Sequence, residues 1–159
     1  MNGSNLTLEE QACNYATMLH IARVRDLLNV MVKELLDRGR FHDLSKLMPP
    51  EVAAFTKMTP ELSGLTYGTP EYDASKVALG EALQHHYAKN RHHPEHFKRG
   101  IRDMNLIDLL EAFCDWKAGS ERHTTGNLRK SIQINAGRFQ MPPELVEIFE
   151  NTVELVETP

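Results

Sequence analysis

The 159-residue chain has only two cysteines, Cys13 and Cys114, and no CxxC spacing. Two cysteines are too few for a disulfide framework, so each is expected to be a buried small hydrophobic residue in a reducing compartment. The sequence also lacks a run of about 18 apolar residues that could span a bilayer. Its N-terminus has neither the basic start nor the apolar stretch of a secretory signal. These absences predict a cytoplasmic protein with no membrane partner.

An excess of basic residues is missing as well. The chain has 18 Lys and Arg against 22 Asp and Glu, for a net charge of -4. Proteins that bind long nucleic acids usually carry a strong basic excess, so this charge argues against such a partner. Basic residues nevertheless gather between positions 89 and 102, where they could attract a small anion. The acidic stretch at positions 144–157 is predicted to be a solvated helix face.

The spacing of apolar residues predicts an all-α fold, because no segment shows convincing strand alternation. The length, with 41% hydrophobic and 25% charged residues, predicts a single domain over residues 1–159. We expect a bundle of about six to seven helices. Long helices are predicted from Leu8 to Gly39, from Pro70 to about Lys89 and from Met104 to Ala118, with others over 51–57, 126–139 and 143–156.

Eight histidines set among acidic residues in a helical protein indicate a metal site. His20 lies in the middle of a predicted helix, where a histidine by itself is more often structural. His42 and Asp43 are more informative, since neighbours can bind one metal when a helix start or kink turns both side chains inward. An isolated His-Asp dipeptide is common by chance, so further residues are needed.

Three carboxylates on one helix supply that support. Asp108, Glu111 and Asp115 stand at i, i+3 and i+7, on one face of the predicted helix. The face could be a solvated stripe, yet Leu109 and Phe113 mark the flanking faces as buried. A carboxylate at that boundary needs a partner, and a cation would serve.

The order His20, then "FHDLSKL" with His42 and Asp43, then Asp115 in "FCDWKAG" resembles the HD-domain superfamily of metal-dependent phosphohydrolases. The resemblance covers roughly residues 8–120, with the helices at 126–156 packing on this core. It implies an HD-like helical fold in which these four residues bind a divalent cation, with Asp108 as the alternative to Asp115. The tracts "LQHHYAKNRHHPEH", "LIDLLEAFCDWKA" and "SIQINAGRF" also look like a small HD-like family of phage and bacterial genomes.

The sequence departs from two branches of that superfamily. No glutamate stands at position 46, and no Gly-Tyr-Pro triplet follows the adjacent histidines His85 and His86. Neither the nucleotidase branch nor the cyclic-dinucleotide branch is therefore matched in full. Lys46 matches a lysine often found after the HD pair, where it could neutralise a phosphate oxygen or pair with a carboxylate.

The histidine tract from position 85 to 93 has three interpretations: a second metal, contacts to a substrate, or surface and structural histidines. On a continuous helix, neighbours diverge by about 100°, so at most one of His85 and His86 can point straight into a shared site. The catalytic candidates are Asp43, Lys46, His85 and His86. The candidates for substrate binding are Arg91, His92, His93, Lys98 and Arg102.

Mixed imidazole and carboxylate ligands suit Mn, Fe, Co, Mg or Zn, and the site would hold one such ion or two. A cation of this kind can lower the pKa of a bound water toward neutrality. The predicted function is therefore hydrolysis of a nucleotide or another small phosphate ester. The main alternative is a non-catalytic, metal-stabilised helical module that binds a nucleotide or a protein. A nuclease is a third, less favoured hypothesis. The helix from Pro143 could also contribute to a homodimer surface.

Overall fold

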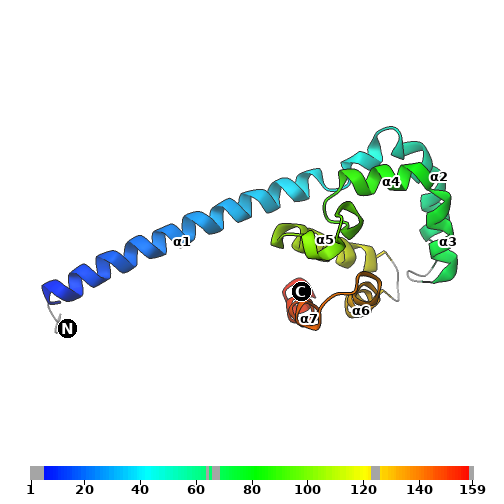
Figure 1. Cartoon of the computed structure of the whole chain (residues 1–159). Helices are drawn as coiled ribbons and strands as arrows, with labels where there is room; N and C mark the ends of the chain where they lie inside the picture. The colour runs from blue at the N-terminus through cyan, green and yellow to red at the C-terminus, as the bar shows by residue number, and fades with distance from the viewer. Residues whose placement is uncertain (1–5, 64, 66–68, 123–125, 158–159) are drawn as a thin grey trace. The chain divides into compact units, whose positions relative to one another are not determined.

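The computed structural model describes residues 6–63, 65, 69–122 and 126–157 (Figure 1). These residues form seven α-helices and three short 3-10 helices, with no strand among them, so the predicted all-α class is confirmed. The chain divides into two compact units, residues 1–40 and 41–159. No helix in the described part of the chain has the length and apolar character needed to cross a membrane.

The first unit is formed by α1 (Leu8–Phe41), close to its predicted range. Thr7 and Glu10 have the sequence spacing of a capping box, and the structure contains it: the Thr7 backbone N–H donates to Glu10 at 2.7 Å, and the Glu10 backbone N–H donates to the Thr7 hydroxyl at 3.2 Å. No residue of α1 is buried, because a single helix has no core of its own. Cys13 lies on this helix and is exposed.

The core of the second unit lies between α5 (Leu106–Ser120), α6 (Leu128–Phe139) and α7 (Pro143–Glu157). Phe113 of α5 is almost fully buried, and its ring centre lies 5.6 Å from that of Phe149 on α7. Ile132 and Val153 are fully buried beside them. Burying side chains of this size contributes about 1.5–3 kcal/mol each, so this cluster holds α5 in place by one face.

A second group of elements packs beside this core (Figure 1). The 3-10 helix η1 (Leu44–Leu47) and α4 (Gly80–Lys89) both pack against α2 (Glu51–Ser63). Two short 3-10 helices, η2 (Pro94–His96) and η3 (Gly100–Asp103), follow α4 and lead into α5. They lie in the stretch between the helices predicted to end at about Lys89 and to begin at Met104.

The predicted helix from Pro70 to Lys89 is divided into α3 (Pro70–Ala78) and α4. Gly80 has φ +49°, in the left-handed region that glycine adopts at little cost, so the helical path changes there. The helix predicted from Met104 begins instead at Leu106, because the Asn105 side chain accepts the backbone N–H of Asp108 and caps it. Cys114 on α5 is exposed, so the expectation that both cysteines are buried was wrong.

Candidate metal centre

The His42–Asp43 pair follows directly after α1. Asp43 has φ +56° and ψ +12°, a left-handed conformation that is uncommon outside glycine but that aspartate tolerates better than most residues. The helical path therefore ends at this pair. This break explains how two adjacent side chains, which would diverge by about 100° on a continuous helix, reach the same cluster.

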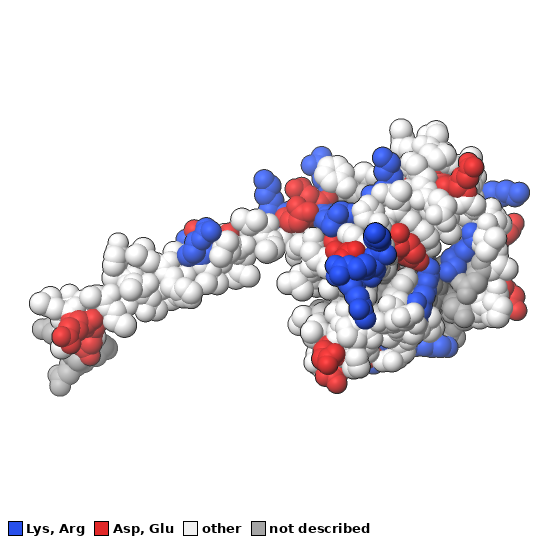
Figure 2. Space-filling model, in the orientation of Figure 1, with Lys and Arg blue, Asp and Glu red and all other residues white. Residues whose placement is uncertain are grey.

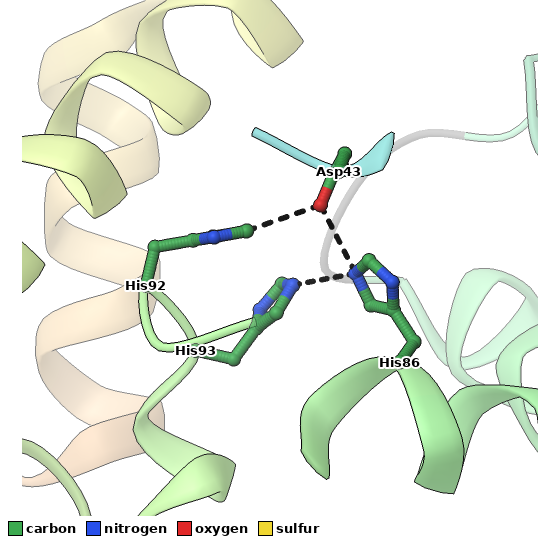
Figure 3. A group of neighbouring side chains, drawn as sticks. All are labelled: Asp43, His86, His92 and His93. Carbon is green, nitrogen blue, oxygen red and sulfur yellow. Dashed lines mark hydrogen bonds and ion pairs between the residues drawn. The ribbon is translucent and has the colours of Figure 1, made fainter. Parts of the chain in front are cut away.

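Side chains from well-separated parts of the second unit meet around Asp43 (Figure 3). His86 comes from α4, His92 and His93 from the stretch between α4 and η2, and Asp115 from α5. Their potential ligand atoms form two groups, each within 4.8 Å: Asp43, His86, His92 and His93 in one, and His42, Asp43, His92 and Asp115 in the other. Asp43 and His92 belong to both groups.

The distances around Asp43 suit ligands that share an ion. Its Oδ1 atom lies 3.4 Å from Nε2 of His86 and 3.5 Å from Nε2 of His92. Nε2 of His42 lies 3.6 Å from Asp43 Oδ2 and 3.5 Å from Asp115 Oδ1. These separations are long for hydrogen bonds. Two atoms that each lie about 2.1 Å from a tetrahedral ion are about 3.4 Å apart, so the spacing fits a bound cation.

Three polar atoms of the cluster are buried without a hydrogen bond, namely Oδ1 of Asp43 and both ring nitrogens of His92. His92 Nδ1 does lie 3.2 Å from Oε1 of Glu111, but the angles do not make a hydrogen bond. Leaving such groups unsatisfied costs about 1–3 kcal/mol each. A cation between Asp43 Oδ1 and His92 Nε2 would remove this cost for those two atoms. The cluster could therefore hold a metal ion, and its mixed His and Asp ligands leave the identity of that ion open.

The cluster combines neutral and charged groups. Contacts with Asp115 and Glu111 raise the pKa of His42 to about 10, so this ring is cationic in the metal-free protein. Burial, followed by the neighbouring rings of His92 and His86, lowers the pKa of His93 to about 2. Burial also lowers the pKa of His86, although the carboxylate of Asp43 opposes the shift. His86 and His93 are thus neutral imidazoles, the form that binds metals.

Asp115 is ionised despite its position. Burial would raise the pKa of Asp115, but His42, His92 and His93 outweigh it and lower that pKa to about 2. Lys46 is the predicted cation beside the pair, and its Nζ lies 2.6 Å from Asp43 Oδ2. It therefore pairs with a carboxylate of the cluster, which is one of the two roles expected of it.

The structure separates the two aspartates that the sequence left as alternatives. Asp108 is fully buried and accepts two hydrogen bonds from Arg91, at 3.1 Å from Nε and 2.9 Å from Nη2. Its carboxylate also accepts the backbone N–H of Asn105 at 3.0 Å in a capping box. Asp108 and Arg91 thus stabilise the start of α5, and Asp115 is the aspartate that joins a ligand group.

The remaining predicted residues are not members of the two ligand groups. His20 lies on α1 in the first unit, and its place among the ligands stays a prediction. His85 is about one third exposed, and its Nδ1 lies 2.7 Å from Oε1 of Glu51. Lys98 and Arg102 are exposed beyond the cluster. Their substrate-binding role also stays a prediction.

A hollow of about 350 Å³ lies between the 94–102 stretch and the end of α6. Arg99, Arg102 and Arg138 line it, but Arg99 pairs with Asp103 and Arg138 with Glu95. On the face of residues 41–159 in Figure 2, basic side chains likewise lie beside acidic ones. Neighbouring carboxylates thus balance the charges of Arg99 and Arg138.

Two residues of the centre were missed as site residues. Glu111 belongs to the carboxylate face that the sequence predicts on this helix, and it contacts His42 and His92. That face is the sequence pattern from which its place in the site could have been predicted. The sequence indicates only that Glu51 begins a short helix, because acidic residues are common in the first turn of helices. It is fully buried against His85 and His86, and no spacing in the sequence indicated this.

The fold and the site define an all-α protein with a His and Asp cluster that could hold a metal ion. Residues 9–157 match a family described as Family of unknown function (DUF5662), and the chain belongs to that family. No curated protein matches the chain, and no solved structure matches it.

Proposed function

We propose that this protein is a metal-dependent phosphohydrolase that acts on a nucleotide or another small phosphate ester. The observation that carries the proposal is the buried, unsatisfied Oδ1 of Asp43, which lies at ligand spacing from the Nε2 atoms of His86 and His92. The resemblance of the His20, His42, Asp43 and Asp115 order to HD-domain enzymes supports the same reading.

The two ligand groups, which share Asp43 and His92, would hold one divalent cation or two. Mn, Fe, Co, Mg and Zn are the candidate ions. When bound, such an ion supplies Lewis acidity and a water whose pKa is lowered toward neutrality. Lys46, whose Nζ pairs with Asp43 Oδ2, would neutralise a phosphoryl oxygen at this centre.

His85 is the proposed proton donor for the leaving group. The sequence offers His86 and Glu81 for this role as well, but His86 is 2% exposed within a ligand group, whereas His85 is 33% exposed and contacts Glu51. Glu51 orients the His85 ring, since Glu51 Oε1 lies 2.7 Å from Nδ1. The exposed side chains of Lys98 and Arg102 would contact the rest of an anionic substrate.

The test is metal analysis of the purified protein, followed by phosphate release from a panel of nucleotides with Mn, Co, Mg or Zn added. We expect metal-dependent release by the wild type and none by Asp43→Asn. Asp103→Asn is the matched control, because Asp103 pairs with Arg99 outside the cluster. Absence of bound metal, together with equal release by wild type and Asp43→Asn, would overturn the proposal.

A non-catalytic, metal-stabilised module is the second candidate, and one observation favours it. Each ligand group offers four protein ligands, and four protein ligands without an open position are typical of structural metal sites. In that case the protein would bind the metal and gain thermal stability, but no phosphate ester in the panel would be hydrolysed.

A further inference from the structure

Glu51 is a fully buried carboxylate at the first position of α2. Its Oε1 lies 2.7 Å from Nδ1 of His85, and its Oε2 lies 2.8 Å from Nδ1 of His86. Ser45 donates its hydroxyl to Oε2 at 3.0 Å. A buried carboxylate needs such donors, because leaving an unpaired charge in the interior is costly.

The contacts of Glu51 indicate which atoms donate. Ser45 accepts a hydrogen from the Asn90 amide and donates its own hydroxyl hydrogen to Glu51 Oε2, so this oxygen acts as an acceptor. His86 Nδ1 lies 2.8 Å from the same oxygen, and a contact this short needs a hydrogen between the two atoms. The Nδ1 atom of His86 must therefore carry that hydrogen.

The contact between Asn90 and His86 does not require the Nε2–H tautomer of His86. Its Nδ2 lies 3.0 Å from His86 Nδ1 and could donate to a lone pair there. However, the two hydrogens of this amide are taken by the His86 carbonyl and the Ser45 hydroxyl, each at 2.8 Å. With the hydrogen of His86 on Nδ1, its Nε2 lone pair faces Asp43 at 3.4 Å and His93 at 2.8 Å.

Glu111 repeats this arrangement on the other side of Asp43. Its Oε1 lies 3.0 Å from Nδ1 of His42 and 3.2 Å from Nδ1 of His92. The Nε2 atoms of both rings again point toward Asp43, at 3.6 and 3.5 Å from its two oxygens. Glu111 and Glu51 come from α5 and α2, so two independent elements impose the same ring orientation.

We propose that Glu51 and Glu111 are positioning residues that hold the rings of His86, His42 and His92 with their Nε2 atoms toward Asp43, and that Glu51 fixes the Nδ1–H tautomer of His86. This inference rests on the proposed metal site. Partners of this kind, which hold the second nitrogen of a histidine ligand, raise the basicity of the ligand and fix its tautomer. Neither glutamate belongs to a ligand group.

The tautomer can be read without metal. Long-range ¹⁵N–¹H correlation spectra of metal-free protein with labelled histidine distinguish Nδ1–H from Nε2–H rings, and the spectrum of His86→Gln assigns the His86 signals. We expect His86 in the Nδ1–H form in wild type. In Glu51→Gln this population is expected to fall, because an amide offers one acceptor oxygen where the carboxylate offered two.

Metal affinity provides the second measurement. Titration with Co²⁺ or Zn²⁺ by calorimetry should show roughly 10–100-fold weaker binding for Glu51→Gln and Glu111→Gln than for wild type. Glu150→Gln is the matched control, since Glu150 pairs with Arg129 and Gln133 away from the cluster. Glu51→Asp keeps an acceptor and should retain more affinity than Glu51→Gln.

Two results would overturn the proposal: an Nε2–H tautomer for His86 in wild type, or unchanged affinity in both glutamine variants. The wild-type spectrum needs only His86→Gln for its assignment, so a Glu51→Gln protein that fails to fold would not prevent the test. If wild type binds no metal but shows the expected tautomer, the proposed function falls, whereas the orienting role of Glu51 is supported.

Discussion

The Oδ1 atom of Asp43 lies 3.5 Å from Nε2 of His92, and both atoms are buried without a hydrogen bond. Their local surroundings explain this. Asp43 is held in a left-handed backbone conformation, and its other oxygen is paired with Lys46. His92 is 1% exposed, so water cannot easily satisfy its ring. A cation bound between these two atoms would therefore stabilise the folded state more than one bound elsewhere in the cluster.

Metal binding should stabilise the protein. At a free concentration about 100 times Kd, an ion that binds only the folded state adds about 2.7 kcal/mol. We expect Tm to rise with Mn²⁺, Co²⁺ or Zn²⁺ and to fall again with EDTA, as measured by thermal denaturation. Asp43→Asn should lose the shift, and Asp103→Asn should keep it. Equal shifts in the two variants would contradict a site at Asp43.

Replacing Asp115 with asparagine should weaken metal binding by more than the roughly 10–100-fold typical of an outer partner, because Asp115 itself offers a ligand oxygen. Calorimetric titration measures this directly. Asp108→Asn serves as the comparison on the same helix, and it should change folding stability while leaving the metal affinity close to that of wild type. The reverse result would return Asp108 to the ligand set.

Arg91→Ala should destabilise the fold, because the buried Asp108 carboxylate would lose both hydrogen bonds that it accepts from the Arg91 guanidinium. Breaking a buried pair costs about 3–5 kcal/mol, and the partial exposure of Arg91 favours the lower end, about 3 kcal/mol. Urea denaturation measures the loss. Arg99→Ala removes an exposed pair and should have little effect. A raised KM with unchanged stability would instead support the substrate-binding role.

The metal-free protein should lose stability as the pH rises through the alkaline range. The pKa of His42 is raised from 6.5 to about 10 in the folded state, so its contribution is fully present below pH 6.5 and is lost as the pH rises to about 10. In EDTA, the free energy of unfolding should fall more between pH 7 and 10 in wild type than in His42→Gln. Parallel pH profiles would show that the His42 contacts contribute nothing.

Phe113→Ala should cost about 3–5 kcal/mol, because Phe113 is almost fully buried and packs on Phe149. Leu106→Ala, on the same helix but 75% exposed, should change stability by less than about 0.5 kcal/mol. Chemical denaturation of both variants provides the comparison. A small loss for Phe113→Ala would mean that the α5–α7 contact does not hold α5.

Much of the fold could be predicted because it depends on local rules. The Thr7 and Glu10 spacing predicted the cap of α1, and apolar periodicity predicted α6 and α7 with nearly correct bounds. The break at Gly80 was missed because a glycine inside a helical pattern does not reveal its φ angle. The start of α5 was misplaced because Asp103 and Asn105 are both acceptable caps, and only contacts decide between them.

The sequence by itself determined the all-α class and the ligand chemistry, because helical periodicity and the residue types His and Asp are local properties of the chain. It also brought His42, Asp43 and Asp115 into one hypothesis. Only the tertiary structure decided that Asp108 pairs with Arg91, that His92 joins both ligand groups, and that Glu51 is buried against His85 and His86. Arg91 and Asp108 are 17 positions apart, and Glu51 and His86 are 35 positions apart, so these contacts arise only when separate elements of the chain pack together.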